Sequence, residues 1–140
     1  GVFAGGADTT DVIDFITIAT TATSATDFGN LSVARKAPAG CSNSTRALFG
    51  GGETPSNSDI IDYITIATTG NAVDFGDLTA ARNTTGATSS PTRGIFAGDG
   101  STDTIDKVEI LTTGDAVDFG NLGRGSSRCY GAFSNGHGGL

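Results

Sequence analysis

A repeated segment organises this chain. Residues 61–82, IDYITIATTGNAVDFGDLTAAR, reappear in variant form at 13–35 and 105–124. The spacing is 47 residues from Phe28 to Phe75 and 44 residues from Phe75 to Phe119. Self-similarity at such a period predicts one supersecondary unit per repeat, each burying its apolar faces against its neighbours. We therefore treat the 140 residues as a single domain of three repeats, approximately 1–46, 47–93 and 94–140.

Each repeat is predicted to contain four short β-strands. An apolar strand that ends at glycine opens the repeat, and a variable polar loop follows at 7–10, 53–58 and 99–103. The next strand, 60–67 in the middle copy, is partly apolar on both alternating faces, which is typical of a strand covered on both sides. No helical periodicity competes with this pattern, and Gly, Thr and Ile suit turn-dense β-structure.

The second half of each repeat begins with a turn. Thr69-Gly70-Asn71 and Thr113-Gly114-Asp115 are good hairpin signals, and Thr21-Ala22-Thr23 replaces them in the first copy. An Asp-Phe-Gly strand follows at 27–31, 74–78 and 118–122 and ends near an arginine. The last segments, 39–46, 85–93 and 131–138, are rich in Gly, Ser and Thr, which predicts an inner strand that needs small side chains.

Charge and composition exclude several classes of function. The net charge of −7 argues against nucleic acid and anionic membranes as partners, because both require clustered Lys and Arg. No apolar run approaches 18 residues, so no membrane insertion is expected, and no secretory signal is visible. The chain has no Met, from which we expect a processed product or an excerpt of a longer protein.

Motifs that suggest catalysis lack their structural context. The Asp-Phe-Gly triplets have no accompanying nucleotide loop or His-Arg-Asp, and the glycine runs have no Gly-Lys-Ser/Thr. His137 is the single histidine, and no nucleophile elbow accompanies it. Cys41 and Cys129 are interpreted as buried small hydrophobes, with a structural bridge as the alternative. We predict no catalytic residue, no cofactor and no metal site.

Acidic residues recur at two kinds of position. In the variable loops they could hold Ca²⁺, but no copy matches a calcium-binding repeat, and solvated acidic loops are the simpler interpretation. Asp14, Asp62 and Asp106 lie on a half-buried strand face and need partners. The arginines that occur once per repeat (Arg35, Arg82 and Arg124, or Arg46 and Arg93) supply them, so we predict structural ion pairs within or between repeats.

The order of these elements resembles the kelch repeat, a four-stranded blade of a β-propeller. The glycine pair is present as Gly5-Gly6 and Gly51-Gly52 and is broken in Gly98-Asp99-Gly100. Phe28, Phe75 and Phe119 stand where the family usually has Trp, and Arg35, Arg82 and Arg124 stand at its Arg. The amino-acid sequence of the repeat is more specifically similar to kelch-like repeats in structural and tail-fibre proteins of marine bacteriophages, cyanophages in particular.

The resemblance implies an all-β fold of three four-stranded kelch-like blades. Three blades do not close a ring, so the resemblance implies either part of a larger ring or closure by oligomerisation, as when two chains form one six-bladed ring. A rod or β-solenoid is the remaining architecture. Partners would then be other copies, or the remainder, of the same propeller.

The function implied is that of a non-enzymatic virion module, located on a virion or outside the cell. Loops on a rigid scaffold carry recognition, so the face formed by the variable loops and the connections 36–40, 83–88 and 125–128 is expected to contact a host surface glycan or another virion protein. Its candidate ligand-binding residues are Asp8, Asp11, Glu53, Asn57, Asp59, Asp99 and Asp103. An architectural spacer is the alternative, and a propeller-type carbohydrate-active enzyme is disfavoured.

Overall fold

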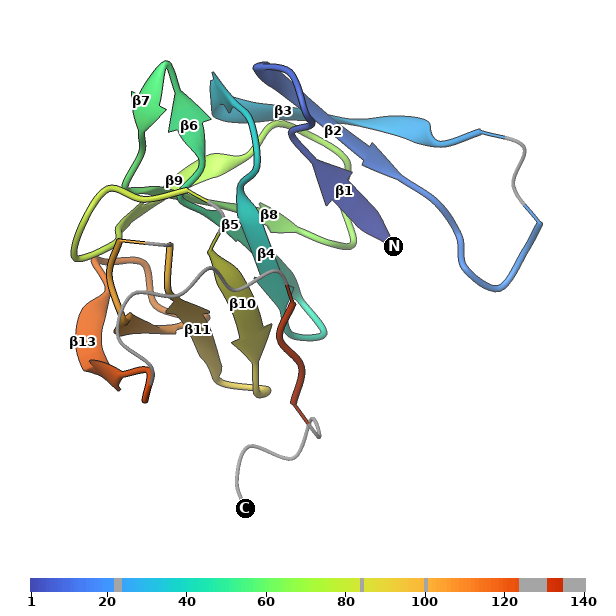
Figure 1. The fold of residues 1–140 in the computed structure, drawn as a ribbon. Coiled ribbons are helices and arrows are strands. Elements are labelled where there is room, and N and C mark those ends of the chain that lie inside the picture. The colour runs from blue at the N-terminus through green and yellow to red at the C-terminus, as the bar shows by residue number, and fades with distance from the viewer. Residues whose placement is uncertain (22–23, 84, 100, 124–130, 135–140) are drawn as a thin grey trace.

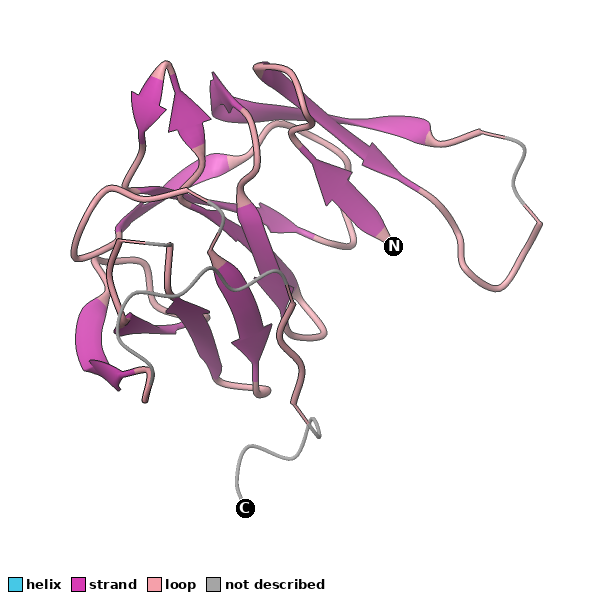
Figure 2. Cartoon of the chain, viewed as in Figure 1, coloured by secondary structure: helices cyan, strands magenta, loops and turns pink. Residues whose placement is uncertain are grey.

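The chain forms an all-β structure (Figures 1 and 2). The computed structural model describes residues 1–21, 24–83, 85–99, 101–123 and 131–134. These residues form antiparallel sheets of three, four and four strands, together with a small two-stranded hairpin. No helix that could cross a bilayer occurs within these ranges.

The sheets follow one another along the chain. Sheet 1 contains β1 (Val2–Ala4), β2 (Thr10–Phe15) and β3 (Thr26–Arg35) in that order. Sheet 2 contains β4 (Ala39–Ser42), β5 (Arg46–Gly50), β8 (Ile60–Thr65) and β9 (Val73–Asp77). Sheet 3 contains β10 (Gly86–Ser89), β11 (Arg93–Ala97), β12 (Thr104–Glu109) and β13 (Val117–Asn121). The hairpin of β6 (Glu53–Thr54) and β7 (Ser56–Asn57) lies in the loop between β5 and β8.

The sheets are displaced by one strand from the sequence repeats. Strand β4 comes from the end of the first repeat, yet it pairs with β5 of the second, with Cys41 opposite Leu48. Strand β10 joins sheet 3 in the same way, with Thr88 opposite Ile95. The first repeat does contain the four predicted strands, but sheet 1 has only three, because the fourth strand, β4, joins the sheet of the next repeat. The corresponding last segment, 131–138, is described only at 131–134, which form no strand.

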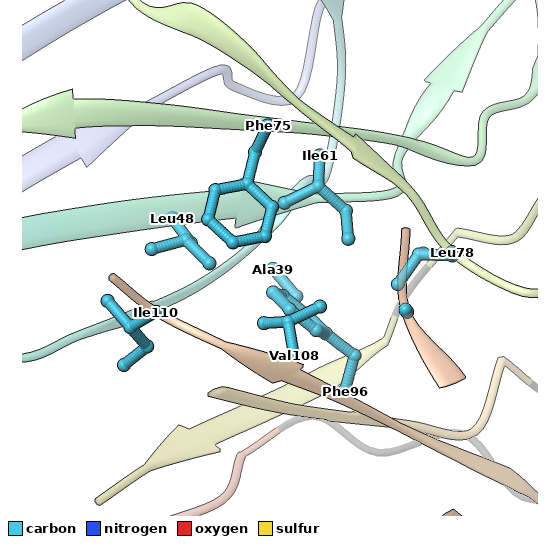
Figure 3. Close-up of a cluster of buried hydrophobic side chains, with 9 residues drawn as sticks. Ala39, Leu48, Ile61, Phe75, Leu78, Phe96, Val108 and Ile110 are labelled. Carbon is cyan, nitrogen blue, oxygen red and sulfur yellow. The ribbon is translucent and has the colours of Figure 1, made fainter. Parts of the chain in front are cut away.

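Two apolar clusters hold the three sheets together. Sheets 1 and 2 pack through a cluster that includes Ile13, Phe28 and Phe49. Sheets 2 and 3 pack through a second cluster, shown in Figure 3, that includes Leu48, Phe75 and Phe96. Sheet 2 is thus covered on both faces, as the two-sided apolar pattern of residues 60–67 predicts. Burial of each phenylalanine contributes about 1.5–3 kcal/mol.

The connections between β8 and β9 and between β12 and β13 reach across to the preceding sheet. Gly70 donates its N–H to the Phe28 carbonyl at 2.8 Å, and Gly114 repeats this contact with Phe75 at 2.7 Å. The glycine of the Asp-Phe-Gly triplet makes room for this connection, since a Cβ on Gly29 would lie 2.3 Å from the Gly70 oxygen. The two hairpins are present as predicted, but the chain turns at 65–68 and 109–112. The predicted turn residues, Thr69-Gly70-Asn71 and Thr113-Gly114-Asp115, lie in the longer connection that docks on the preceding sheet.

Candidate functional site

The middle variable loop, 53–59, contacts the connections on either side of it. The polypeptide segment that leaves β3 at Lys36 forms an isolated bridge with Glu53. The backbone groups of these two residues exchange hydrogen bonds of 3.0 and 2.9 Å. Figure 1 shows the β6–β7 hairpin beside the end of β3. We call the surface formed by 53–59, Lys36 and Asn83 the loop face.

Glycines position the base of this face. Gly5, Gly51 and Gly98 occupy the same place in the three repeats and share a φ near +67° (68°, 67° and 67°), which L side chains rarely adopt. Gly52, at φ 105°, donates its N–H to the Arg82 carbonyl at 2.9 Å. A Cβ there would lie 2.7 Å from the Lys36 oxygen. The glycine pair thus brings the loop against two connections at once.

A buried ion pair holds the end of β3, where the connection from sheet 1 to sheet 2 begins. Arg35, at the end of β3, lies 3.0 Å from Asp62 of sheet 2, and both side chains are fully buried. Arg35 also donates to the Phe49 carbonyl at 3.0 Å, and Asp62 accepts the Ser32 N–H at 3.1 Å. Burial lowers the pKa of Arg35, and the Asp62 carboxylate opposes this effect. The predicted pairing of these residues is present, and it links one sheet to the next.

The second copy of this pair is more completely hydrogen-bonded. Arg82 pairs with Asp106 of sheet 3 and donates to the Thr104 carbonyl at 3.2 Å. Asp106 also accepts the N–H and hydroxyl of Thr79 at 2.9 and 2.7 Å. Arg124, the third predicted arginine, lies outside the described residues. No ion pair with Asp14 is found among the residues the structure describes.

A polar network anchors the tip of the middle loop. The Lys36 ammonium lies 3.2 Å from Glu53, and Asn83 donates to Glu53 at 3.1 Å and to Asn57 at 2.9 Å. Two of the candidate ligand-binding residues, Glu53 and Asn57, are therefore brought together with both adjacent connections. Pro55, Ser56 and Asp59 remain exposed around them.

The third loop has a different internal structure. Asp99 stands at the position of Gly52 and is buried, with a carboxylate that accepts the N–H groups of Ser101 and Thr102 at 2.6 and 2.7 Å. Burial alone would raise the pKa of Asp99, but these hydrogen bonds hold it below its usual value. Its role is to shape the loop locally, as Asp does in turns.

The other candidate ligand-binding residues do not lie together in one site. Asp11 accepts a hydrogen bond from Asn30 at 3.0 Å, Asp8 is exposed, and the Asp59 and Asp103 carbonyls accept N–H groups at 2.7 Å. Within the described ranges, no group of three or more His, Cys, Asp or Glu residues is placed to hold a metal ion.

Of the two cysteines, only Cys41 lies within the described residues. Burial raises the pKa of the Cys41 thiol to about 12, which makes it a poor nucleophile. Cys129 and His137 lie outside the described residues.

The sequence interpretation missed a polar surface near the inner strands. Ser89 Oγ donates to the Ser42 carbonyl at 2.6 Å, and Ser134 repeats this contact with Ser89. A shallow hollow of about 390 Å³ lies beside these serines and the adjoining turns. The regular spacing of serine in the small-residue segments was the available signal.

Comparison with family models and with curated proteins finds no match for this sequence.

Proposed function

We propose that this chain is a run of kelch-like β-propeller blades that serves as a non-enzymatic binding module of a phage virion. Three features support the architecture: antiparallel sheets that pack face to face, an inner strand contributed by the preceding repeat, and a glycine pair under the variable loop. The amino-acid sequence of the repeats, which resembles that of kelch-like repeats in phage proteins, supports the phage origin and a virion or extracellular location.

The observation that carries the binding role is the way in which the middle loop is held. The three repeats share most of their strand residues but differ in their loops, and the middle loop is fixed by Lys36, Asn83 and two close backbone approaches. Binding residues are commonly carried on loops that a rigid scaffold positions. A preorganised loop loses little conformational entropy when it binds, which favours recognition.

The chemistry of the loop face fits a neutral or basic polar ligand. The exposed groups of the middle loop are amide, hydroxyl and carboxylate groups, namely Ser56, Asn57 and Asp59. Such groups exchange hydrogen bonds with the hydroxyls of a sugar. We therefore favour a host surface glycan over a second virion protein as the ligand.

A glycan array with matched variants tests this function. Wild-type protein is expected to bind a restricted set of host glycans, and Asn57→Ala combined with Asp59→Ala is expected to lose that binding. Asp27→Ala serves as the control, because Asp27 is an exposed acid on β3 away from the loop. Binding that survives the loop substitutions, or falls equally in the control, would contradict the assignment. Failure of the wild type to bind any glycan would leave the architectural spacer.

A further inference from the structure

Sheet 3 carries an uncovered copy of a surface that is buried twice elsewhere in the chain. Phe28 and Phe75 are 5% and 2% exposed beneath the following sheet, whereas Phe119 at the same repeat position is 57% exposed. Gly120 keeps the positive φ of its counterparts (144°), but nothing lies within 4 Å of the position a Cβ would take. Ile95, Ile105 and Leu122 are also partly exposed, although their counterparts Leu48, Ile61 and Leu78 are buried.

Sheet 1 carries the complementary surface. Phe49 and Phe96 are 5% and 0% exposed because they pack against the preceding sheet, whereas Phe3 at the same position is 58% exposed. Asp14 likewise has no ion pair within the described ranges, although its counterparts Asp62 and Asp106 are both paired. The two ends of the three-sheet stack thus present the two halves of the interface that its interior uses.

Among the described residues, no strand pairs with β1 on the side away from β2. The equivalent edge of β5 is paired with β4, and that of β11 is paired with β10. A hollow of about 360 Å³ adjoins this part of sheet 1, and its lining includes Gly1 and Val2 together with residues of β4 and β5.

Residues 131–134 have the sequence and position of such a strand. They read Gly-Ala-Phe-Ser, matching Gly-Ala-Thr-Ser at 86–89. Ser134 donates to the Ser89 carbonyl as Ser89 donates to Ser42, so this segment lies next to β10 as β10 lies next to β4. Within the described chain it belongs to no sheet, and Phe133 is 94% exposed.

We propose that two copies of this chain associate head to tail into a closed dimer, in which residues 131–134 of each copy become the missing inner strand of the other copy's sheet 1. Sheet 3 of each copy then covers Phe3 of the other copy, and sheet 1 of each copy covers Phe119 of the other copy. A face-to-face dimer of two sheets 3 would leave β1 without its strand. Because both halves of the interface are on one chain, a heterologous contact that closes after two copies satisfies both ends. This inference does not depend on the proposed ligand.

The pairing of β4 with β5 specifies the register of the exchanged strand. Ala39 is opposite Gly50 and Cys41 is opposite Leu48. The corresponding positions place Gly131 opposite Ala4 and Phe133 opposite Val2 of the other copy. Residues directly opposite in an antiparallel pair have Cβ atoms about 4.5–5.5 Å apart, close enough for a disulfide after small adjustments.

A crosslinking experiment tests that register. One chain carries Ala4→Cys and a differently tagged chain carries Gly131→Cys, both in a background of Cys41→Ala and Cys129→Ser. Mixing and mild oxidation are expected to link the two tags. The control pairs Ala4→Cys with Ala132→Cys, whose side chain points to the other face of the strand. No link between the tags, or equal linking in the control, would overturn the proposed pairing.

Sedimentation of the wild type tests the association itself. A dimer of twice the 13.9 kDa chain is expected, and a monomer or an open ladder of oligomers would overturn the proposal. Phe119→Asp and Phe3→Asp should each raise the dissociation constant at least about tenfold, since each removes a buried ring. Val117→Asp is the control, because its counterpart Val73 stays 55% exposed where the sheet is covered. An effect of Phe119→Asp without one of Phe3→Asp would indicate a face-to-face dimer instead.

Discussion

The buried pair between Arg35 and Asp62 provides the sharpest test of how the sheets are held together. In the Asp62→Ala variant the guanidinium of Arg35 would keep only the Phe49 carbonyl as a hydrogen-bond acceptor, at 3.0 Å. It would also be fully buried without a counter-charge. Removing one partner of a buried ion pair costs about 3–5 kcal/mol, because the remaining charge is uncompensated.

The loss should appear directly in the free energy of unfolding. Domains of ordinary size are stable by only about 5–15 kcal/mol, so a loss of about 3–5 kcal/mol in Asp62→Ala should remove about a fifth or more of that stability. Urea unfolding followed by circular dichroism, at one protein concentration, would show a lower midpoint with an unchanged slope.

A matched control separates burial from charge. Glu109 pairs with Arg93 at 3.1 Å, but these side chains are 49% and 52% exposed. Glu109→Ala should therefore change the free energy of unfolding by no more than about 1 kcal/mol. The double variant Arg35→Leu with Asp62→Ala should recover much of the loss, because no buried charge then remains. Equal effects of Asp62→Ala and Glu109→Ala would refute the reasoning.

Two further predictions concern the base of the loop face and the core. Gly52→Ala should destabilise the protein by more than about 1 kcal/mol in urea unfolding, because its Cβ would lie 2.7 Å from the Lys36 oxygen at a φ of 105°. Gly123→Ala is the control, because nothing lies within 4 Å of the Cβ position there. Equal losses of stability in the two variants would contradict the steric argument. Burial raises the pKa of the Cys41 thiol from 9.0 to about 12. The resulting contribution to the free energy of unfolding is fully present below pH 9 and is lost as the pH rises from 9 towards 12. Unfolding measured across that range should therefore show a steeper loss of stability than in Cys41→Ala, and parallel curves would contradict this.

The sequence was most informative where an interaction recurs from one repeat to another. The period, the strand positions and the Asp–Arg pairing could all be predicted, because each leaves a residue of the same type at the same spacing. The partner of the small-residue strand could not, because Gly, Ala, Ser and Thr carry little preference for either neighbour. Its pairing with β5 is decided by long-range packing, with Cys41 opposite Leu48.

Contacts that occur in one repeat alone left no such signal. The network of Lys36, Glu53 and Asn83 depends on the approach of two connections, which no local pattern encodes. Asp99 differs from this network, because the sequence already shows that it replaces the second glycine of the pair present in the other two repeats. That departure indicated a different loop, but the hydrogen bonds to Ser101 and Thr102 could only be seen in the structure.

The displacement of the sheets from the sequence repeats has a consequence for how such a chain can evolve. The first and second repeats donate their last strands, β4 and β10, to the next sheet, so sheets 2 and 3 each combine strands of two repeats. A duplication or deletion of one whole period, with crossover points at equivalent residues, regenerates the same junction on both sides of the splice. The number of units can therefore change by unequal recombination without disturbing the pairing of any sheet, whereas an indel of a fraction of a period would leave one sheet with a missing or mismatched strand.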